Sequence, residues 1–130
     1  MLHRTTTSLG LVALVALVAL VALVACDNDP SAPVCSDVLV PALLVSVVDS
    51  ATGASAIGGA TIVARTATTT DSVTVTAGNT DPVGVANERS GTFTLTVRQT
   101  GYQTWTKSGI VVTRGACHVN PVEVTARLQR

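Results

Sequence analysis

Three cysteines and one histidine beyond the N-terminal segment are the residues of this 130-residue chain whose types suit chemistry. The histidine, His118, directly follows Cys117, and no Gly-x-Ser-x-Gly signature supplies a nucleophile for it. Metal binding by Cys35, Cys117 and His118 lacks a fourth ligand and the paired spacing of zinc sites. We therefore expect no catalytic residue and no metal site, with His118 a partly exposed loop residue.

The carboxylates and glycines give no sign of catalysis either. Four acidic residues lie in or near turn sequences, where such side chains stabilise the local backbone: Asp49, Asp71, Asp81 and Glu88. No spacing marks two of them as an acid–base pair. Gly58-Gly59 leads into a strand pattern, and no phosphate-binding loop sequence accompanies it. The chain is therefore predicted to be non-enzymatic and to bind neither a nucleotide nor a cofactor.

The N-terminal segment has the pattern of an exported protein. After His3 and Arg4, the seventeen residues from Leu9 to Ala25 are uncharged and consist largely of five Leu-Val-Ala repeats. At about 1.5 Å per residue this segment would span roughly 25 Å as a helix, slightly less than a bilayer core of about 30 Å. Its length alone therefore fits both a signal peptide and a marginal membrane anchor.

The residues that end this segment decide between the two. Leu23-Val24-Ala25-Cys26, followed by the polar Asp27-Asn28-Asp29-Pro30, resembles a bacterial lipobox. The resemblance implies a helical signal peptide over residues 1–25, cleavage before Cys26 and a lipid such as palmitate on the Cys26 thiol. Two or more acyl chains hold a protein at a membrane stably, whereas one chain binds reversibly. A plain signal peptide or an uncleaved anchor, with Cys26 incidental, is the alternative.

The two cysteines that remain predict a disulfide. Residues 26–37 have no apolar period and contain two prolines, so they are expected to form a polar tether. An even pair of cysteines in an exported protein is typical of a structural disulfide. We predict a Cys35–Cys117 bridge, which closes a loop of about 80 residues and, in the chain-entropy model, stabilises the domain by up to roughly 4 kcal/mol.

The charge distribution excludes nucleic acid as a partner. The chain has eight basic and eight acidic residues, and loss of Arg4 with the signal peptide leaves a net charge of −1, because all acidic residues lie after residue 25. The basic residues are scattered and form no run that suits a phosphate backbone or an anionic membrane. The expected partner is a protein or a glycan, and the expected membrane contact is the lipid on Cys26.

From residue 38 onward the sequence favours strands. Segments rich in Val, Thr and Ala are separated by Gly, Asn, Asp and Pro clusters, and none has a sustained helical period. Strands are expected over segments that include residues 43–48, 60–67, 71–77, 92–98, 110–113 and 122–128, whereas residues 78–90 show no clear period. The alternation is clearest where Phe93, Leu95 and Val97 share one face. Residues 38–130 are therefore predicted to be all-β, closed as a seven-stranded β-sandwich.

Several of these segments combine a turn with a strand in a recurring way. They are Val47-Val48-Asp49, Thr52-Gly53, Ile57-Gly58-Gly59-Ala60-Thr61-Ile62-Val63, and Gly91-Thr92-Phe93-Thr94-Leu95-Thr96-Val97 leading to Gly101-Tyr102. In this pattern, over roughly residues 38–128, the chain resembles the carboxypeptidase regulatory-like domain, a transthyretin-like (prealbumin-like) sandwich. The resemblance implies that Gly101-Tyr102 closes the hairpin after the Phe93 strand. Glu88-Arg89-Ser90 stands where these domains usually carry an Asp-Gly pair.

Tyr102 and Trp105 are the candidate binding residues. Because they are three apart in an expected extended region, they fall on opposite faces, which exposes one ring to stack on a sugar or to anchor a protein. The other interpretation is that all aromatic rings pack in the core.

Together these features predict a non-enzymatic bacterial envelope lipoprotein, held by lipid, with an extracytoplasmic domain in the periplasm or at the cell surface. The domain is expected to bind a protein or glycan, or to contribute to envelope assembly, through loops at one end of the sandwich. Two alternatives remain: a carbohydrate-binding module that uses Trp105 or Tyr102, and an accessory domain that spaces or stabilises a larger envelope complex.

Overall fold

The computed structural model describes residues 32–130, of which Pro33–Arg130 form one compact unit. The predicted signal peptide over residues 1–25 and the predicted lipidation residue Cys26 lie outside the described residues. Within the described range, no helix has the length and apolar character that a membrane crossing requires.

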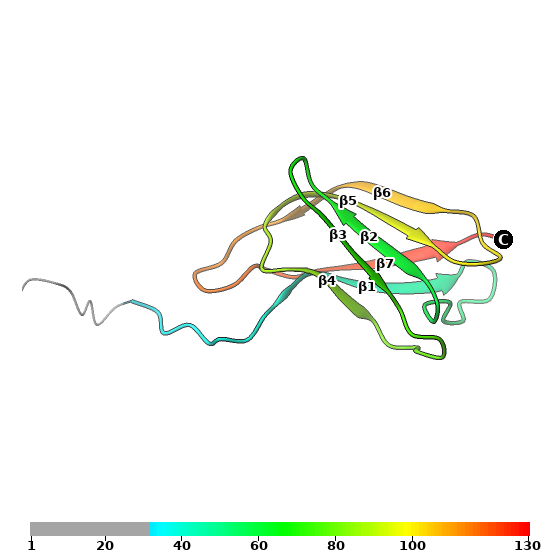
Figure 1. The fold of residues 1–130 in the computed structure, drawn as a ribbon, viewed down its shortest axis with the longest axis horizontal. Coiled ribbons are helices and arrows are strands. Elements are labelled where there is room, and N and C mark those ends of the chain that lie inside the picture. The colour runs from blue at the N-terminus through cyan, green and yellow to red at the C-terminus, as the bar shows by residue number, and fades with distance from the viewer. Residues whose placement is uncertain (1–31) are drawn as a thin grey trace, which may run out of the picture. The chain divides into compact units, whose positions relative to one another are not determined.

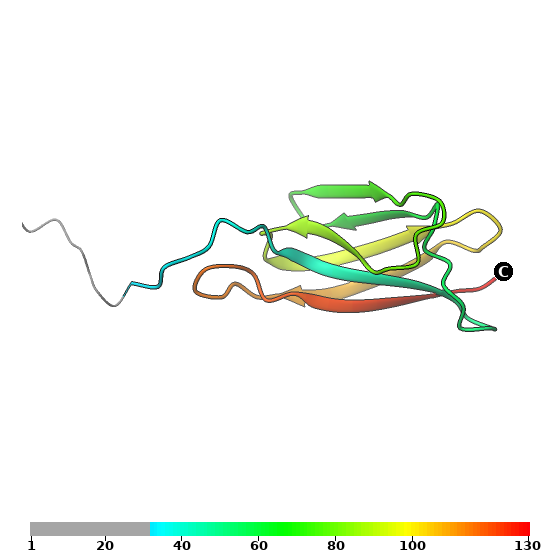
Figure 2. The same ribbon diagram turned by 90° about the horizontal axis from the view of Figure 1, so that it is seen from below.

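Seven strands form two facing sheets (Figure 1 and Figure 2). In chain order they are β1 (Pro41–Asp49), β2 (Thr61–Arg65), β3 (Thr70–Thr74), β4 (Val83–Asn87), β5 (Gly91–Arg98), β6 (Trp105–Val112) and β7 (Val122–Leu128). One sheet has the order β4-β1-β7 and the other β3-β2-β5-β6. Strands β1 and β7 are parallel, and all other neighbours are antiparallel. The predicted all-β class and seven-stranded arrangement are thus confirmed.

Alternate residues from both sheets fill the core. The predicted inward face of β5 is confirmed, since Phe93, Leu95 and Val97 are at most 1% exposed. Strand β1 lies at the centre of its sheet, with Leu43 and Val45 buried and the residue between them half-buried. The nearly continuous apolar sequence of β1 therefore reflects a central strand with one fully buried face.

The segment over residues 78–90 differs from the sequence expectation, because it contains β4. This strand pairs antiparallel with β1. Its sequence hides the usual alternation because Val85 and Ala86 are buried in succession. Ala86 has a φ of 60°, so the chain turns locally and places two successive side chains inside.

Strand β6 also differs, because it begins at Trp105 and not near residue 110. Its first half is a polar, exposed edge from Thr106 to Gly109, which carries no apolar alternation. The register with β5 shifts between Phe93 and Leu95, and Gly109 opposite has a φ of 74°, a backbone conformation that glycine adopts without a Cβ penalty. The bulge and Lys107 on this edge both disfavour pairing with another strand.

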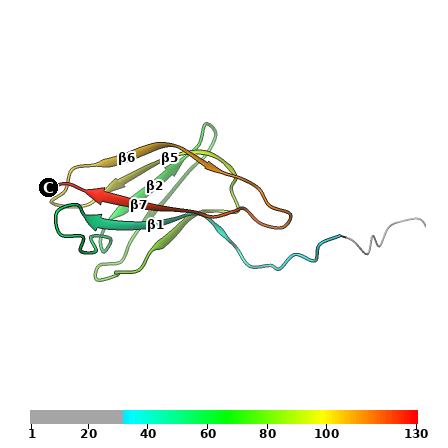
Figure 3. The ribbon, with the colours of Figure 1, turned by 180° about the vertical axis from the view of Figure 1, so that it is seen from behind.

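The sandwich has two ends with different loops, which Figure 1 and Figure 3 show from opposite sides. The proximal end, where the described chain enters, contains residues 33–40, 88–90 and 113–121. The distal end contains residues 50–60, 75–82 and 99–104, together with Arg130.

Candidate functional site

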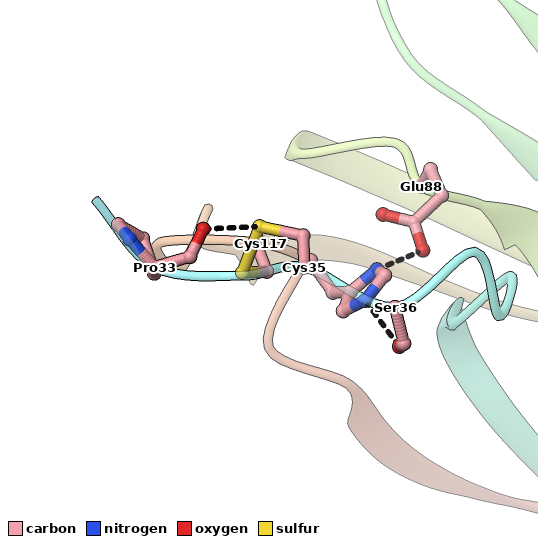
Figure 4. The surroundings of a disulfide bond; sticks show 6 residues. Pro33, Cys35, Ser36, Glu88 and Cys117 are labelled. Carbon is pink, nitrogen blue, oxygen red and sulfur yellow. Dashed lines mark hydrogen bonds and ion pairs between the residues drawn. A yellow bond between two sulfur atoms is a disulfide. The ribbon is translucent and has the colours of Figure 1, made fainter. Parts of the chain in front are cut away.

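The proximal end contains the disulfide that the sequence predicts. Cys35 and Cys117 are joined by an S–S bond of 2.06 Å, with their Cα atoms 5.2 Å apart (Figure 4). The bond connects the segment before β1 with the loop between β6 and β7. The described start of the chain is therefore covalently attached to the last loop of the domain.

Next to the disulfide, His118 lies between the carboxylate of Glu88 and the hydroxyl of Ser36. Its Nδ1 is 2.8 Å from Glu88 Oε1, and its Nε2 is 3.2 Å from Ser36 Oγ. The His118 and Glu88 side chains are 24% and 26% exposed, so the expectation of a partly exposed loop histidine is met. We call Cys35, Ser36, Glu88, Cys117 and His118 the proximal cluster.

Glu88 is held in place by the start of the domain as well as by His118. Its Oε1 accepts the Val40 backbone N–H at 2.7 Å, and its own backbone N–H donates to the Val40 carbonyl at 2.9 Å. The hydrogen bond from Val40, more than the His118 ring, keeps the pKa of the Glu88 carboxyl below its ordinary value, against an opposing effect of burial. These reciprocal bonds also hold Glu88 at a φ of 56°, in the turn between β4 and β5.

A tight turn presents Cys117 and His118 to the cluster. The Gly115 backbone N–H donates to the His118 carbonyl at 2.7 Å. A Cβ at position 115 would lie 2.9 Å from that same oxygen, so only glycine closes the turn without displacement. The loop geometry thus depends on one residue that has no chemical role of its own.

The proximal cluster has the hydrogen-bond order of a serine hydrolase triad, Ser–His–Glu. No sequence signature predicts this pairing, because Ser36 and His118 are 82 residues apart. Chemically the arrangement can do two things. It can polarise the Ser36 hydroxyl, or it can fasten the segment before β1 to the proximal loops.

At the distal end, the Asp49 carboxylate is the centre of a second cluster. Asp49 is 4% exposed and is the one buried polar residue in the described range. Its Oδ1 accepts the backbone N–H groups of Ala51 and Thr52 at 2.9 and 3.0 Å. Its Oδ2 accepts the Tyr102 hydroxyl at 2.9 Å and Arg130 Nε at 3.0 Å. We call Asp49, Tyr102 and Arg130 the distal cluster.

These donors make the Asp49 carboxyl strongly acidic. The backbone hydrogen bond from Thr52 contributes most, followed by Tyr102, and together the donors hold the pKa of Asp49 well below its ordinary value. The Arg130 guanidinium also lies 5.2 Å from the centre of the Tyr102 ring, a cation–π distance. Asp49 therefore stabilises a turn, as its sequence context predicts, and in addition binds the Tyr102 hydroxyl and the Arg130 guanidinium.

The expectation that Tyr102 and Trp105 belong to one extended region and so fall on opposite faces of it is not met. Tyr102 lies in a turn, where its backbone N–H donates to the Gln99 carbonyl at 3.1 Å, because the chain reverses direction between β5 and β6. This turn closes the hairpin between β5 and β6. Both rings are half-buried and pack against the core. The Tyr102 hydroxyl is already engaged by Asp49, so of the two candidates Trp105 is the one that borders open space.

Trp105 lines a cleft of about 300 Å³ near the distal end. The other residues that line it are polar and come from the loop before β6, from β6 itself and from the end of β7 and the residue after it: Gln103, Thr104, Thr106, Arg127 and Gln129. We call this hollow the Trp105 cleft. It offers an aromatic surface beside amide, hydroxyl and guanidinium groups, which suits a polar ligand with both apolar and hydrogen-bonding surfaces.

Within residues 32–130, no three or more His, Cys, Asp or Glu side chains are grouped so that they suit a metal ion. No protein-family model matches this chain, and no curated protein is similar enough to match it.

Proposed function

We propose that this chain is an exported bacterial envelope lipoprotein whose extracytoplasmic sandwich is a non-enzymatic binding module. The lipobox-like sequence supports a signal peptide over residues 1–25 and a lipid on Cys26. The Cys35–Cys117 disulfide supports an oxidising compartment, because such bonds persist outside the cytoplasm.

The observation that carries the binding role is the position of the Trp105 cleft. The segment before β1 is fastened at the proximal end, whereas the cleft lies near the distal end. A domain held at a membrane through its proximal end presents its distal end to other envelope components. The loops at that end are therefore the proposed contact region.

The chemistry of the cleft favours a glycan among the expected ligands. An indole face stacks on the apolar face of a sugar ring, and side-chain amides and hydroxyls pair with sugar hydroxyls. In this second candidate function, a carbohydrate-binding module, Trp105 is the contact residue. Tyr102 acts indirectly, by fixing the turn before β6.

We also propose that the domain is of the transthyretin-like, carboxypeptidase regulatory-like type. Two of the segments that carry the resemblance end at Asp49 and Tyr102, which are 53 positions apart in the sequence and in contact in the fold. This contact supports a shared architecture, because it gives the two sequence patterns a common structural role.

For the proximal cluster we favour fastening over catalysis. Glu88 accepts from both Val40 and His118, so the same contacts that orient the histidine also secure the first residues of β1. Ester hydrolysis that disappeared in both Ser36→Ala and His118→Ala, with the fold intact, would contradict the non-enzymatic proposal.

Two experiments test the proposed function on the full chain extracted in detergent. The intact mass of the wild type and of Cys26→Ala should show acylation only when Cys26 is present, and an unmodified wild type would contradict the lipid anchor. A glycan array should then give binding that is lost in Trp105→Ala and retained in Val38→Ala, since Val38 is an exposed apolar residue at the proximal end. Constant co-purification with one protein, without glycan binding, would instead favour the accessory-domain role.

A further inference from the structure

The outer face of the four-stranded sheet is unusually uniform in its chemistry. The strand registers place the following side chains on it: Thr61, Val63, Arg65, Thr70, Ser72, Thr74, Thr92, Thr94, Thr96, Arg98, Thr106, Ser108 and Val111. We call this surface the threonine face. Most of these residues carry a hydroxyl, and the alternate residues of the same strands fill the core.

Neighbouring strands hold these hydroxyls in rows. The side-chain oxygens of Thr94 and Ser108 are 3.2 Å apart, and those of Thr96 and Thr106 are 3.4 Å apart. Each hydroxyl has one donor and two acceptor sites, so those in the rows still have capacity for an external ligand. The face is therefore a preorganised hydrogen-bonding surface.

Two arginines border a hollow in the middle of this face. The hollow has a volume of about 170 Å³ and is lined by Val63, Arg65, Thr94, Thr96 and Arg98. Arg65 lies opposite Thr94, whereas Arg98 lies opposite Thr61. The two arginines are therefore four positions apart along the β2–β5 pair, roughly 13 Å at 3.3 Å per residue.

These two positive charges have no acidic partner in the part of the chain that the structure describes. Neither Arg65 nor Arg98 forms an ion pair there. Asp71, the acidic residue of β3, lies on the opposite side of its strand from the threonine face. There its carboxylate accepts the Ala86 backbone N–H at 2.8 Å. The threonine face is thus positively charged on a chain whose formal net charge is zero.

We propose that the threonine face binds a linear acidic polysaccharide that carries carboxylates. The guanidinium groups pair with carboxylates in a bidentate way, and the hydroxyl rows pair with the sugar hydroxyls between them. A nucleic acid fits less well, because the face has no aromatic ring for base stacking and only two positive charges for phosphates. A membrane surface fits less well, because Val63 and Val111 are the only apolar side chains on the face and neither is long enough to insert deeply between lipids. The hollow between the two arginines shares no lining residue with the Trp105 cleft, although Thr106 belongs to both the cleft lining and the threonine face. The test of this site does not depend on the lipid anchor.

The test uses the full chain in detergent with polygalacturonate as the probe and its fully methyl-esterified, uncharged form as the comparison. Isothermal titration should show binding to the acidic polymer alone, weakened at least roughly tenfold in Arg65→Gln/Arg98→Gln. Arg65→Lys/Arg98→Lys keeps the positive charges but lacks the planar guanidinium groups. Its affinity for the acidic polymer should therefore fall less than that of the double glutamine variant. The matched control is Arg89→Gln/Arg114→Gln, which removes the same charge from the proximal loops and should bind like the wild type.

Several results would overturn the proposal. They are equal binding of the acidic and esterified polymers, absence of binding to both, and an equal loss in the two double glutamine variants. Tighter binding to polyphosphate or to anionic lipid vesicles would assign the face to phosphate groups. Loss of polygalacturonate binding in Trp105→Ala, with retention in Arg65→Gln/Arg98→Gln, would move the site to the Trp105 cleft. Thermal midpoints of the arginine variants within the error of the wild type establish that the fold is retained, since the arginine side chains lie outside the core.

Discussion

The first and the last residues of the described chain are attached to opposite ends of the sandwich, and different interactions hold them there. At the proximal end a disulfide and partly exposed hydrogen bonds hold the residues before β1. At the distal end a buried carboxylate holds Arg130, which follows β7, through hydrogen bonds that include the Tyr102 hydroxyl. A covalent bond acts whether or not water reaches it, whereas the distal cluster depends on the ionised state of Asp49. The proximal end should therefore respond to reductant and the distal end to acid.

The largest effect is expected from removing the disulfide. Cys35→Ser/Cys117→Ser opens a loop with a sequence separation of 82, which should lower the free energy of unfolding by up to about 4 kcal/mol in the chain-entropy model. Urea unfolding of the oxidised wild type and the variant measures this loss. The reduced wild type is the control and should match the variant. An unchanged unfolding midpoint would mean that the bond contributes no stability and only fixes the position of the chain before β1.

Asp49→Asn should produce the next largest effect, and it should depend on pH. The folded state lowers the pKa of Asp49, so its contribution to stability is full above the ordinary value of about 3.8 and is lost as the pH falls toward the folded pKa. The substituted side chain also directs an amide N–H₂ group or a neutral oxygen at Arg130, in place of a carboxylate. Thermal midpoints by circular dichroism should be lower than wild type at pH 7 and should decline less in acid.

The control for this prediction is Asp81→Asn, which changes the same kind of charge on an exposed turn. It should leave the acid-dependent decline of the wild type in place. Parallel profiles for the wild type and Asp49→Asn would show that other carboxylates govern the acid sensitivity.

Tyr102→Phe is expected to have a smaller effect at the same end. It removes the hydrogen bond that the Tyr102 hydroxyl donates to Asp49 and the exposed one that it accepts from Arg130. Because the ring stays packed against the core, a loss of about 1 kcal/mol is expected. Because the two side chains are in contact, the double variant Tyr102→Phe/Asp49→Asn should lose less free energy of unfolding than the sum of the losses in the two single variants. Strict additivity in urea unfolding would show that the Tyr102 hydroxyl and the Asp49 carboxylate do not stabilise the fold jointly.

Local patterns in the sequence were sufficient for much of the fold. The alternation of Phe93, Leu95 and Val97 predicts β5, and the even number of cysteines that remains if Cys26 is lipidated, as proposed, predicts Cys35–Cys117. Strand β4 was not predicted, because the positive φ of Ala86 turns the backbone so that Val85 and Ala86 are buried in succession. A strand that buries two successive residues lacks the two-residue alternation of apolar and polar residues by which strands are recognised in a sequence.

The candidate sites were less predictable, because their contacts join distant positions. Asp49 has the local signature of a turn residue, whereas its bond to Arg130 spans 81 positions. Trp105 was selected by residue type alone, and the cleft becomes visible only when β7 brings Arg127 beside it. The two arginines of the threonine face are 33 positions apart in the sequence, and the β2–β5 register places both on the same face of the sheet.

The smallest effect is expected from His118→Ala at the proximal end. Glu88 keeps its hydrogen bond from the Val40 N–H in this variant, so the segment before β1 stays partly fastened. Glu88→Ala removes the hydrogen bonds to both the Val40 N–H and His118, so it should loosen the segment before β1 more than His118→Ala does. Hydrogen exchange at the Val40 amide, measured by NMR, reports directly on the fastening and should accelerate in the order wild type, His118→Ala, Glu88→Ala.

Acid should reduce these differences. Because the fold lowers the pKa of Glu88, its contribution is present above the ordinary value of a glutamate and is lost as the pH falls through the folded pKa. Protection of Val40 in the wild type should then approach that in Glu88→Ala, while the disulfide still holds Cys35 in place. Faster Val40 exchange in His118→Ala than in Glu88→Ala would reverse the assignment. The histidine, and its bond to Ser36, would then be the main non-covalent contact at the proximal end.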